Sequence, residues 1–212
     1  MSYFPIFVEL EGKECLVVGG GGVAFRKVQV LREFGAAVTV VAPEIIQGIC
    51  SMDGVKLLKR KFQTADLEGK ALVVAAVNDK GLNHMISQEC QKSEILVNAV
   101  DQQEDCTFIF PSYIKQKEVV GAFSSGGQSP VVTQYLKKQL QPVLNEYIGE
   151  IAECLGEIRQ EVKQKVKIGN QRKCLYQEIL GRCLEEGKLL PKEQLEQMIK
   201  HYSSREEETW IE

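Results

Sequence analysis

A run of four glycines, Gly19 to Gly22, constrains the fold of this chain more than any other feature. It lies directly after an apolar segment, Cys15–Val18, which has the composition of a buried strand. Apolar residues then recur at spacings that place them on one face of a helix: Val23, Val28, Leu31 and Phe34. The order of these segments predicts a strand, a tight turn and the start of a helix in immediate succession.

The glycine run contains Gly19-x-Gly21-x-x-Ala24, which fits the dinucleotide-binding fingerprint in the form that ends in alanine. Gly19 permits the tight turn, and Gly21, which has no Cβ, lets a pyrophosphate approach the backbone. Ala24 is small enough for helix and strand to pack closely, and the free N–H groups of the helix start face the anion. Glycine loops also serve as plain turns, so the position between a strand and a helix is what favours a nucleotide site.

Strand-like and helix-like segments alternate through the first half of the chain. The predicted strands are Cys15–Val18, Ala37–Val41, Val55–Leu58, Leu72–Val77 and Ile95–Val100. The predicted helices between them are Val23–Phe34, Glu44–Ser51 and Lys80–Lys92. Nearly continuous apolar strands that alternate with helices indicate a parallel sheet covered on both faces. We therefore expect an α/β fold, with a Rossmann-like, NAD-binding domain over residues 1–112.

The pattern changes after residue 112. Two short strands, Thr107–Phe110 and Val119–Phe123, are predicted with no helix between them. Ser129 and Pro130 are typical of an N-cap and a first helical turn, so a helix is expected from there to Gln141. From Val143 onward the sequence is wholly helical in pattern. The expected features are a long helix ending near Gly169, a second helix over Asn170–Gly187, a third from Pro191, and a fraying tail, Arg205–Glu208.

Composition excludes several classes of protein. The formal net charge of −3 argues against a nucleic-acid-binding protein, and no apolar run reaches the length of a membrane span. The N-terminus lacks the features of a signal peptide, so a cytoplasmic location is expected. The seven cysteines are odd in number and scattered, which favours a reduced interior over disulfides or a zinc site. The two histidines, His84 and His201, are too few for a histidine-based metal centre, and each is expected on a helix surface.

The end of the second strand departs from the usual NAD site. An acid normally stands there to bind the ribose hydroxyls, but this chain has Val41 and Ala42. Glu44 is the nearest acid, and it either binds the ribose or is a favourable acid in the first turn of a helix. The turn contains no cation for a 2′-phosphate, so NAD is favoured over NADP.

Two further places hold candidate residues. Asp101 follows the fifth strand, at the edge of the sheet where ligands bind in such folds, and is a candidate general base or a plain turn residue. Asp105 is a second candidate by proximity. The small residues of Ser124–Pro130 leave backbone N–H groups at a helix start, which gives either an anion cradle or a capped turn. Arg26 and Lys27 lie just past the glycines and either face solvent or hold substrate carboxylates.

Four segments together resemble one family. VVGGGGVAFRK, NAVD, CTFIFPS and GAFSSGGQSP, in this order and spacing, are similar to precorrin-2 dehydrogenase, the N-terminal module of siroheme synthase. The resemblance covers residues 3–145 well and the helical tail more loosely. It implies an NAD-dependent oxidoreductase acting on CH–CH groups, which oxidises precorrin-2 to sirohydrochlorin on the way to siroheme. It also implies a homodimer built through residues 113–145, a small α+β dimerisation segment, followed by an all-helical C-terminal domain over 146–212.

The resemblance also assigns site residues. It places cofactor contacts at Gly22, Val23, Pro43 and Glu44, and the acid implicated in catalysis at Asp101. Gly22 departs from the family pattern, because members often carry an acidic or polar residue there. Some members are phosphorylated on the second serine of SSGG, which is Ser125 here. Precorrin-2 carries many carboxylates, so its expected contacts are Arg26, Lys27, Ser124, Ser125, Gly126 and Gly127.

Two other functions stay open at the level of sequence. The first is a bifunctional enzyme that also inserts ferrous iron into sirohydrochlorin, with Asp101 accepting the pyrrole protons. We favour dehydrogenation alone, since no other siroheme-pathway domain is found in the sequence. The second is a non-enzymatic NAD-sensing module, which is disfavoured because such modules usually keep the acid at the end of the second strand.

Overall fold

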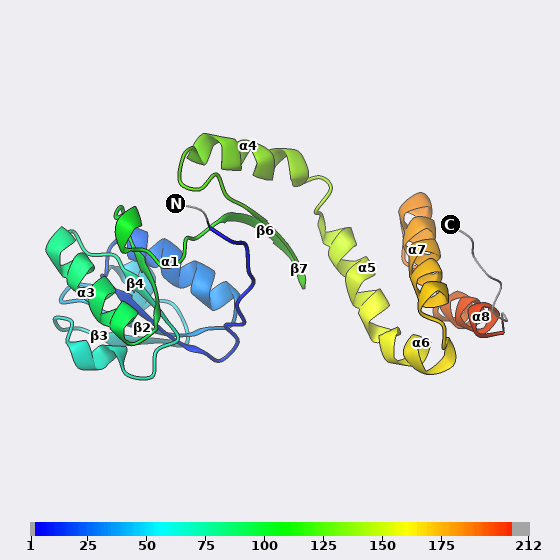
Figure 1. Cartoon of the computed structure of the whole chain (residues 1–212), viewed down its shortest axis with the longest axis horizontal. Coiled ribbons are helices and arrows are strands. Elements are labelled where there is room, and N and C mark those ends of the chain that lie inside the picture. The colour runs from blue at the N-terminus through cyan, green and yellow to red at the C-terminus, as the bar shows by residue number, and fades with distance from the viewer. Residues whose placement is uncertain (1–2, 205–212) are drawn as a thin grey trace. The chain divides into compact units, whose positions relative to one another are not determined.

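The computed structural model describes residues 3–204, which divide between Phe110 and Pro111 into two compact units. Figure 1 traces the chain from blue at the N-terminus, through the cyan and green of the rest of the first unit, to the yellow, orange and red helices near the C-terminus. No helix in the described part of the chain is long and apolar enough to cross a membrane. The further division at residue 145, between a dimerisation segment and a helical domain, stays a prediction.

The first unit is built on a five-stranded parallel sheet in the order β3-β2-β1-β4-β5. Its strands are β1 (Glu14–Val18), β2 (Ala37–Val41), β3 (Val55–Leu58), β4 (Leu72–Ala75) and β5 (Leu96–Ala99). This is the Rossmann-like arrangement expected from the sequence, with the change of strand order between β1 and β4.

Strands β2 and β3 have the predicted bounds, whereas β4 and β5 are shorter than predicted. Strand β4 ends at Ala75 because Val77 beyond it bonds to a side chain and not to a neighbouring strand: Asn83 Oδ1 accepts from the amide of Val77 (3.3 Å). The Asn83 amide also donates to the carbonyl oxygen of Val77 (3.0 Å). At β5 the last ladder bond runs from the amide of Val100 to the carbonyl of Ala75 (2.9 Å), and the chain then turns at Asp101.

Helices cover both faces of the sheet, as the apolar strands predict (Figure 1). They are α1 (Gly22–Glu33), α2 (Gln47–Cys50) and α3 (Lys80–Lys92), with 3₁₀ turns η1 (Thr64–Leu67) and η2 (Gln103–Asp105). Alternate residues of β1 enter different cores. Cys15 and Val17 pack with α1 and α2, while Leu16 and Val18 pack with α3. Helix α2 is much shorter than the predicted Glu44–Ser51 because the residues before it are extended against the glycine loop.

The second unit opens with an antiparallel hairpin, β6 (Ser112–Gln116) and β7 (Val119–Phe123). The predicted strand Thr107–Phe110 is wrong. That segment lies beside β5, where the amide of Thr107 bonds to the carbonyl of Val97 (2.9 Å), and it belongs to the first unit. The strand that pairs with β7 starts after Pro111, and Lys117 makes the hairpin turn with a φ of 54°.

Five helices complete the described part of the second unit: α4 (Pro130–Leu140), α5 (Glu146–Glu157), α6 (Arg159–Lys165), α7 (Gly169–Glu186) and α8 (Lys192–Ser203). Ser129 caps α4 as predicted, its Oγ accepting from the amide of Val132 (3.4 Å). The single long helix expected to end near Gly169 is wrong, because the chain breaks at Ile158, where ψ is −5°. Gly156 weakens the helix just before the break. The predicted fraying of Arg205–Glu208 falls outside the described residues.

Candidate functional site

The glycine loop lies between the ends of β2 and β4, the two strands that flank β1. Gly19 has a φ of +128°, and a Cβ there would lie 2.3 Å from the carbonyl oxygen of Ala76, after β4. A Cβ on Gly20 would lie 2.0 Å from the carbonyl oxygen of Glu44, after β2. Both approaches are to backbone atoms, so only glycine fits. Sequence reasoning gave Gly20 no role, although a fourth consecutive glycine was a signal for one.

The second half of the glycine run faces open space. A Cβ on Gly21 or Gly22 would meet nothing within 4 Å. Gly21 is the N-cap of α1, makes no side-chain cap, and is followed by no acid in the first turn of the helix. The N–H groups and the positive end of the helix dipole are therefore uncompensated at an open surface, which fits the pyrophosphate of a dinucleotide.

The turn after β2 packs against this loop. The amide of Ile46 donates to the carbonyl oxygen of Gly20 (2.9 Å), and Pro43 and Glu44 are both exposed. Ile46 is the N-cap of α2, so Glu44 lies before the helix. The interpretation of Glu44 as a first-turn acid is therefore wrong, and its binding of the ribose stays a prediction. Glu44 lies beside the glycine loop at the carboxyl edge of the sheet.

Asp101 stands in the turn after β5, at the same edge of the sheet. It is exposed and has a φ of +59°, a left-handed conformation that aspartate tolerates better than most residues. The turn is closed by a hydrogen bond from the amide of Gln102 to the carbonyl of Ala99 (3.3 Å). The turn and general-base interpretations of Asp101 are thus compatible, because the turn presents its carboxylate to solvent.

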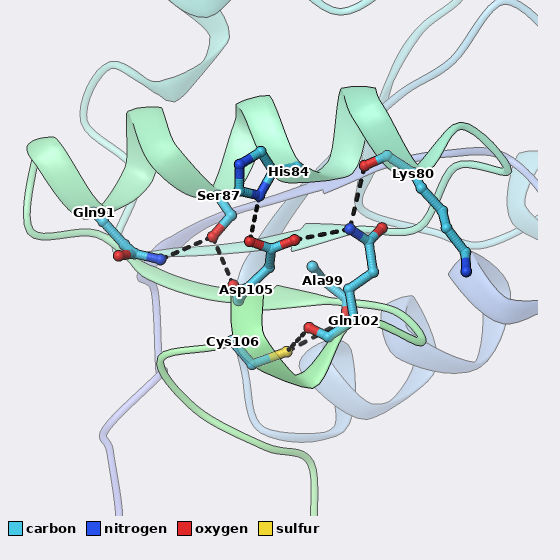
Figure 2. Close-up of polar contacts among 8 residues, drawn as sticks. All are labelled: Lys80, His84, Ser87, Gln91, Ala99, Gln102, Asp105 and Cys106. Carbon is cyan, nitrogen blue, oxygen red and sulfur yellow. Dashed lines mark hydrogen bonds and ion pairs between the residues drawn. The ribbon is translucent and has the colours of Figure 1, made fainter. Parts of the chain in front are cut away.

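A buried polar network holds that turn against α3 (Figure 2). Asp105 is 5% exposed, and its Oδ1 lies 2.6 Å from Nδ1 of His84. The Gln102 amide donates to Oδ2 of Asp105 (2.8 Å) and to the carbonyl of Lys80 (3.2 Å). Ser87 Oγ donates to the main-chain carbonyl of Asp105 (2.6 Å). Asp105 therefore supports the turn that carries Asp101, and its carboxylate is buried among these partners. His84 is half-exposed on α3 as expected, but its distance in sequence from Asp105 hid the pairing.

Lys27 is not a solvated surface residue. Its Nζ lies 3.7 Å from the centroid of the Phe110 ring, a cation–π geometry. Burial, together with the neighbouring charge of Arg26, lowers the pKa of Lys27 to about 8. Arg26 itself is exposed. Lys27 thus combines a fixed position with an amine that titrates near neutral pH.

The serine loop of the second unit bonds largely to itself. Ser125 Oγ accepts from the amide of Ser129 (2.9 Å) and donates to its carbonyl (3.1 Å). The amide of Gly126 donates to Ser124 Oγ (3.0 Å), and that of Gln128 to the carbonyl of Ser125 (3.2 Å). The anion cradle predicted here is therefore smaller than the sequence suggested, because these amides are already bonded.

The cysteines and histidines form no further site in the part of the chain described. All seven cysteines are free thiols, and Cys15 is fully buried in the core, where burial raises its pKa to about 11. Across residues 3–204, no three histidine, cysteine, aspartate or glutamate side chains are grouped so that they could hold a metal ion.

Residues 6–112 match the family described as "Putative NAD(P)-binding". The chain belongs to this family. The match spans the sheet, the glycine loop and the Asp101 turn, so the first unit is an NAD(P)-binding domain.

The chain is also similar to curated siroheme synthases. It is 40% identical over 181 residues to the siroheme synthase of Photorhabdus laumondii subsp. laumondii, covering 84% of this chain and 38% of the relative. It is 36% identical over 203 residues to that of Psychromonas ingrahamii, covering 94% of this chain and 43% of the relative. The chain therefore spans about two fifths of the length of these relatives.

A solved structure shares the fold over 96% of this chain. SirC, a precorrin-2 dehydrogenase, superposes with a TM-score of 0.78 and 24% identity, covering 96% of this chain and 100% of SirC. The hairpin and the C-terminal helices thus belong to the shared fold along with the nucleotide-binding sheet.

Proposed function

We propose that this chain is an NAD-dependent dehydrogenase that oxidises precorrin-2 to sirohydrochlorin. The observation that carries the proposal is the pairing of an open, uncapped helix start at Gly21 with the exposed carboxylate of Asp101 at one edge of one sheet. Similarity to siroheme synthases, and a fold shared with a precorrin-2 dehydrogenase, support this choice of substrate.

Residues of the first unit have two proposed roles, binding of the cofactor and transfer of the proton. Gly19 and Ala24 shape the loop, while Gly21, Gly22 and Val23 offer the helix start to the pyrophosphate. Bound NAD supplies a hydride acceptor. Asp101, held in its turn by the Asp105 network, takes the proton that leaves with the oxidation or orients the macrocycle.

We favour NAD over NADP because of the turn after β2. Its exposed residues are Pro43 and Glu44, and a carboxylate there accepts ribose hydroxyls and repels a 2′-phosphate. Arg60, beyond the neighbouring strand β3, is already paired with Asp66 through two bonds of 2.6 and 2.8 Å.

Carboxylates of the substrate have two proposed sets of contacts. In the first unit these are Arg26 and Lys27, of which Lys27 is the better positioned because Phe110 fixes its amine. In the second unit they are the residues of the serine loop, Ser124–Gly127. The amide of Gly127 forms no hydrogen bond with any described residue, so it is one donor that this loop can offer.

We also propose a cytoplasmic homodimer that buries α4. This helix has no buried residue, and its large apolar side chains lie exposed at successive i, i+4 positions: Val131, Val132, Tyr135, Leu136 and Leu140. An apolar stripe of this kind is expected to be covered by a second copy. Seven free thiols suit a reducing compartment.

Anaerobic turnover of precorrin-2 tests the proposal. The purified chain should reduce NAD, and NADP much more slowly, as sirohydrochlorin appears. Asp101→Asn should slow this turnover at least tenfold while NAD binds as before, because the side chain lies outside the glycine loop. The exposed Asp53→Asn, in the loop before β3, serves as a control of equal charge change.

Tight NAD binding without turnover of precorrin-2 would contradict the dehydrogenase and favour a sensing module. Normal turnover by Asp101→Asn would remove Asp101 from the mechanism. Addition of ferrous iron to the completed reaction then measures whether sirohydrochlorin is converted further by the same chain.

A further inference from the structure

The second unit carries a concentration of positive charge far from the sequence motifs discussed above. Residues 159–173 contain six cations and one acid, in a chain whose formal net charge is −3. The cations are Arg159, Lys163, Lys165, Lys167, Arg172 and Lys173. The acid, Glu161, is paired with Lys165 at 2.6 Å. The other cations of the segment therefore have no acid of their own within it.

Three of these cations, Arg159, Lys163 and Arg172, line a hollow between two helices. A hollow of about 530 Å³ is lined by Arg159, Gln160 and Lys163 of α6 and by Arg172 and Tyr176 of α7. This volume falls in the range of small-molecule sites. Every polar group that lines the hollow is able to donate a hydrogen bond, and none is a carboxylate.

Arg172 is held in place before any ligand arrives. Its Nη1 donates to the main-chain carbonyls of Val166 (2.9 Å) and Lys167 (2.8 Å), at the end of α6. These bonds fix the guanidinium and leave its other N–H groups for a further acceptor. A pre-positioned guanidinium loses little entropy when it binds a planar oxyanion.

Arg159 and Lys163 lie one helical turn apart, at i and i+4, and neither forms an ion pair with any described carboxylate. Like charges at this spacing destabilise a helix. With Arg172 across the hollow, three positive charges share one concave surface without compensation. A bound anion would relieve this repulsion, whereas an ordinary solvated helix face alternates charges of opposite sign.

We propose that this hollow binds a small molecule through two or more oxyanion groups, either carboxylates or phosphates. Arg172 and Arg159 hold oxyanions in the two-pronged manner of guanidinium groups, Lys163 adds a point charge, and Tyr176 forms the aromatic wall. The hollow belongs to the second unit and the glycine loop to the first, and the proposal does not depend on the proposed dehydrogenase activity.

Binding of two probes to the intact chain tests the site. Benzenehexacarboxylate is the carboxylate probe, and inorganic pyrophosphate is the phosphate probe, each measured by calorimetry with NAD at saturation so that the glycine loop is filled. The double variant Arg159→Gln/Lys163→Gln should weaken binding of the preferred probe at least tenfold. Arg172 is left unchanged because its bonds support the end of α6.

The matched control is Lys188→Gln/Lys192→Gln, which removes the same charge from exposed positions of the same unit. It should change binding less than twofold. Preference for one probe identifies the source of the oxyanions. Equal weakening by the two double variants, or no binding of either probe to the parent chain, overturns the proposal, and neither result bears on turnover of precorrin-2.

Discussion

The four glycines should separate into two pairs with opposite phenotypes when each is replaced by alanine. In Gly20→Ala, the new Cβ falls 2.0 Å from the Glu44 carbonyl oxygen and 2.8 Å from Cα of Ile45. Both obstacles are backbone, so the β2 turn has to move. We expect a loss of about 3 kcal/mol in the free energy of unfolding, the upper end for overpacking. Gly19→Ala should cost as much, since its φ of +128° adds strain.

Gly22→Ala should keep or gain stability, whereas Gly21→Ala, at the N-cap of α1, should lose about 1 kcal/mol or less because alanine caps a helix less well than glycine. Their Cβ atoms meet nothing within 4 Å, and Gly22 is already helical, where alanine is favoured by about 0.4–1 kcal/mol. Their main cost should appear in cofactor binding. A methyl group at Gly21 that displaces one charge-assisted hydrogen bond removes about 1.5–3 kcal/mol, which corresponds to roughly 10- to 100-fold weaker binding of NAD.

Urea unfolding followed by circular dichroism measures the first effect, and calorimetric titration with NAD measures the second. Each pair is the control for the other, because the substitution is the same and the positions are adjacent. The reasoning is refuted if Gly20→Ala is as stable as the parent chain, or if Gly21→Ala is stable and binds NAD with unchanged affinity.

Three further outcomes follow from the structure. Lys27 should bind carboxylates while it is charged, so the KM for precorrin-2 should rise as the pH passes the Lys27 pKa of about 8, and Lys27→Met should abolish that rise. Asp105→Ala should lower the free energy of unfolding, measured in urea, by about 1–3 kcal/mol, because the buried side-chain amide of Gln102 loses its acceptor. His84→Gln should cost less, because the His84 side chain is half-exposed. Tyr135→Glu on the exposed stripe of α4 should halve the mass measured by light scattering, whereas Lys138→Glu on the same helix should not.

The sheet could be predicted closely because its strands are nearly continuous apolar runs, whose burial on both faces leaves little choice of structure. Ala37–Val41 and Val55–Leu58 match β2 and β3 to the residue. The errors lie where a distant contact overrides the local pattern. Asn83 ends β4 by bonding to Val77, and Thr107 is drawn to β5 by Val97. Neither contact is visible from composition or periodicity.

In the candidate site too, features set by local backbone chemistry could be predicted, whereas features set by distant contacts could not. The turn at Gly19 and the helix start at Gly21 follow from local backbone chemistry, so the sequence sufficed for both. The demand for glycine at position 20 comes from the carbonyl of Glu44, which reaches the loop only in the folded sheet. The support of the Asp101 turn by Asp105 is hidden likewise, because its partner His84 comes from α3.

The glycine at position 22, where the sequence departs from the pattern of the family it resembles, affects the charge at the start of α1. An acidic side chain at the first position of α1 would partly neutralise the helix dipole and compete with a pyrophosphate for the free N–H groups. This chain has no acid in the first turn of α1 and no side-chain cap at Gly21. The positive end of the α1 dipole therefore depends more on a bound anion for compensation than it would in a helix that begins with an acidic residue. The departure at Gly22 thus strengthens the case for a dinucleotide at this loop, because it leaves the positive end of the helix to the ligand alone.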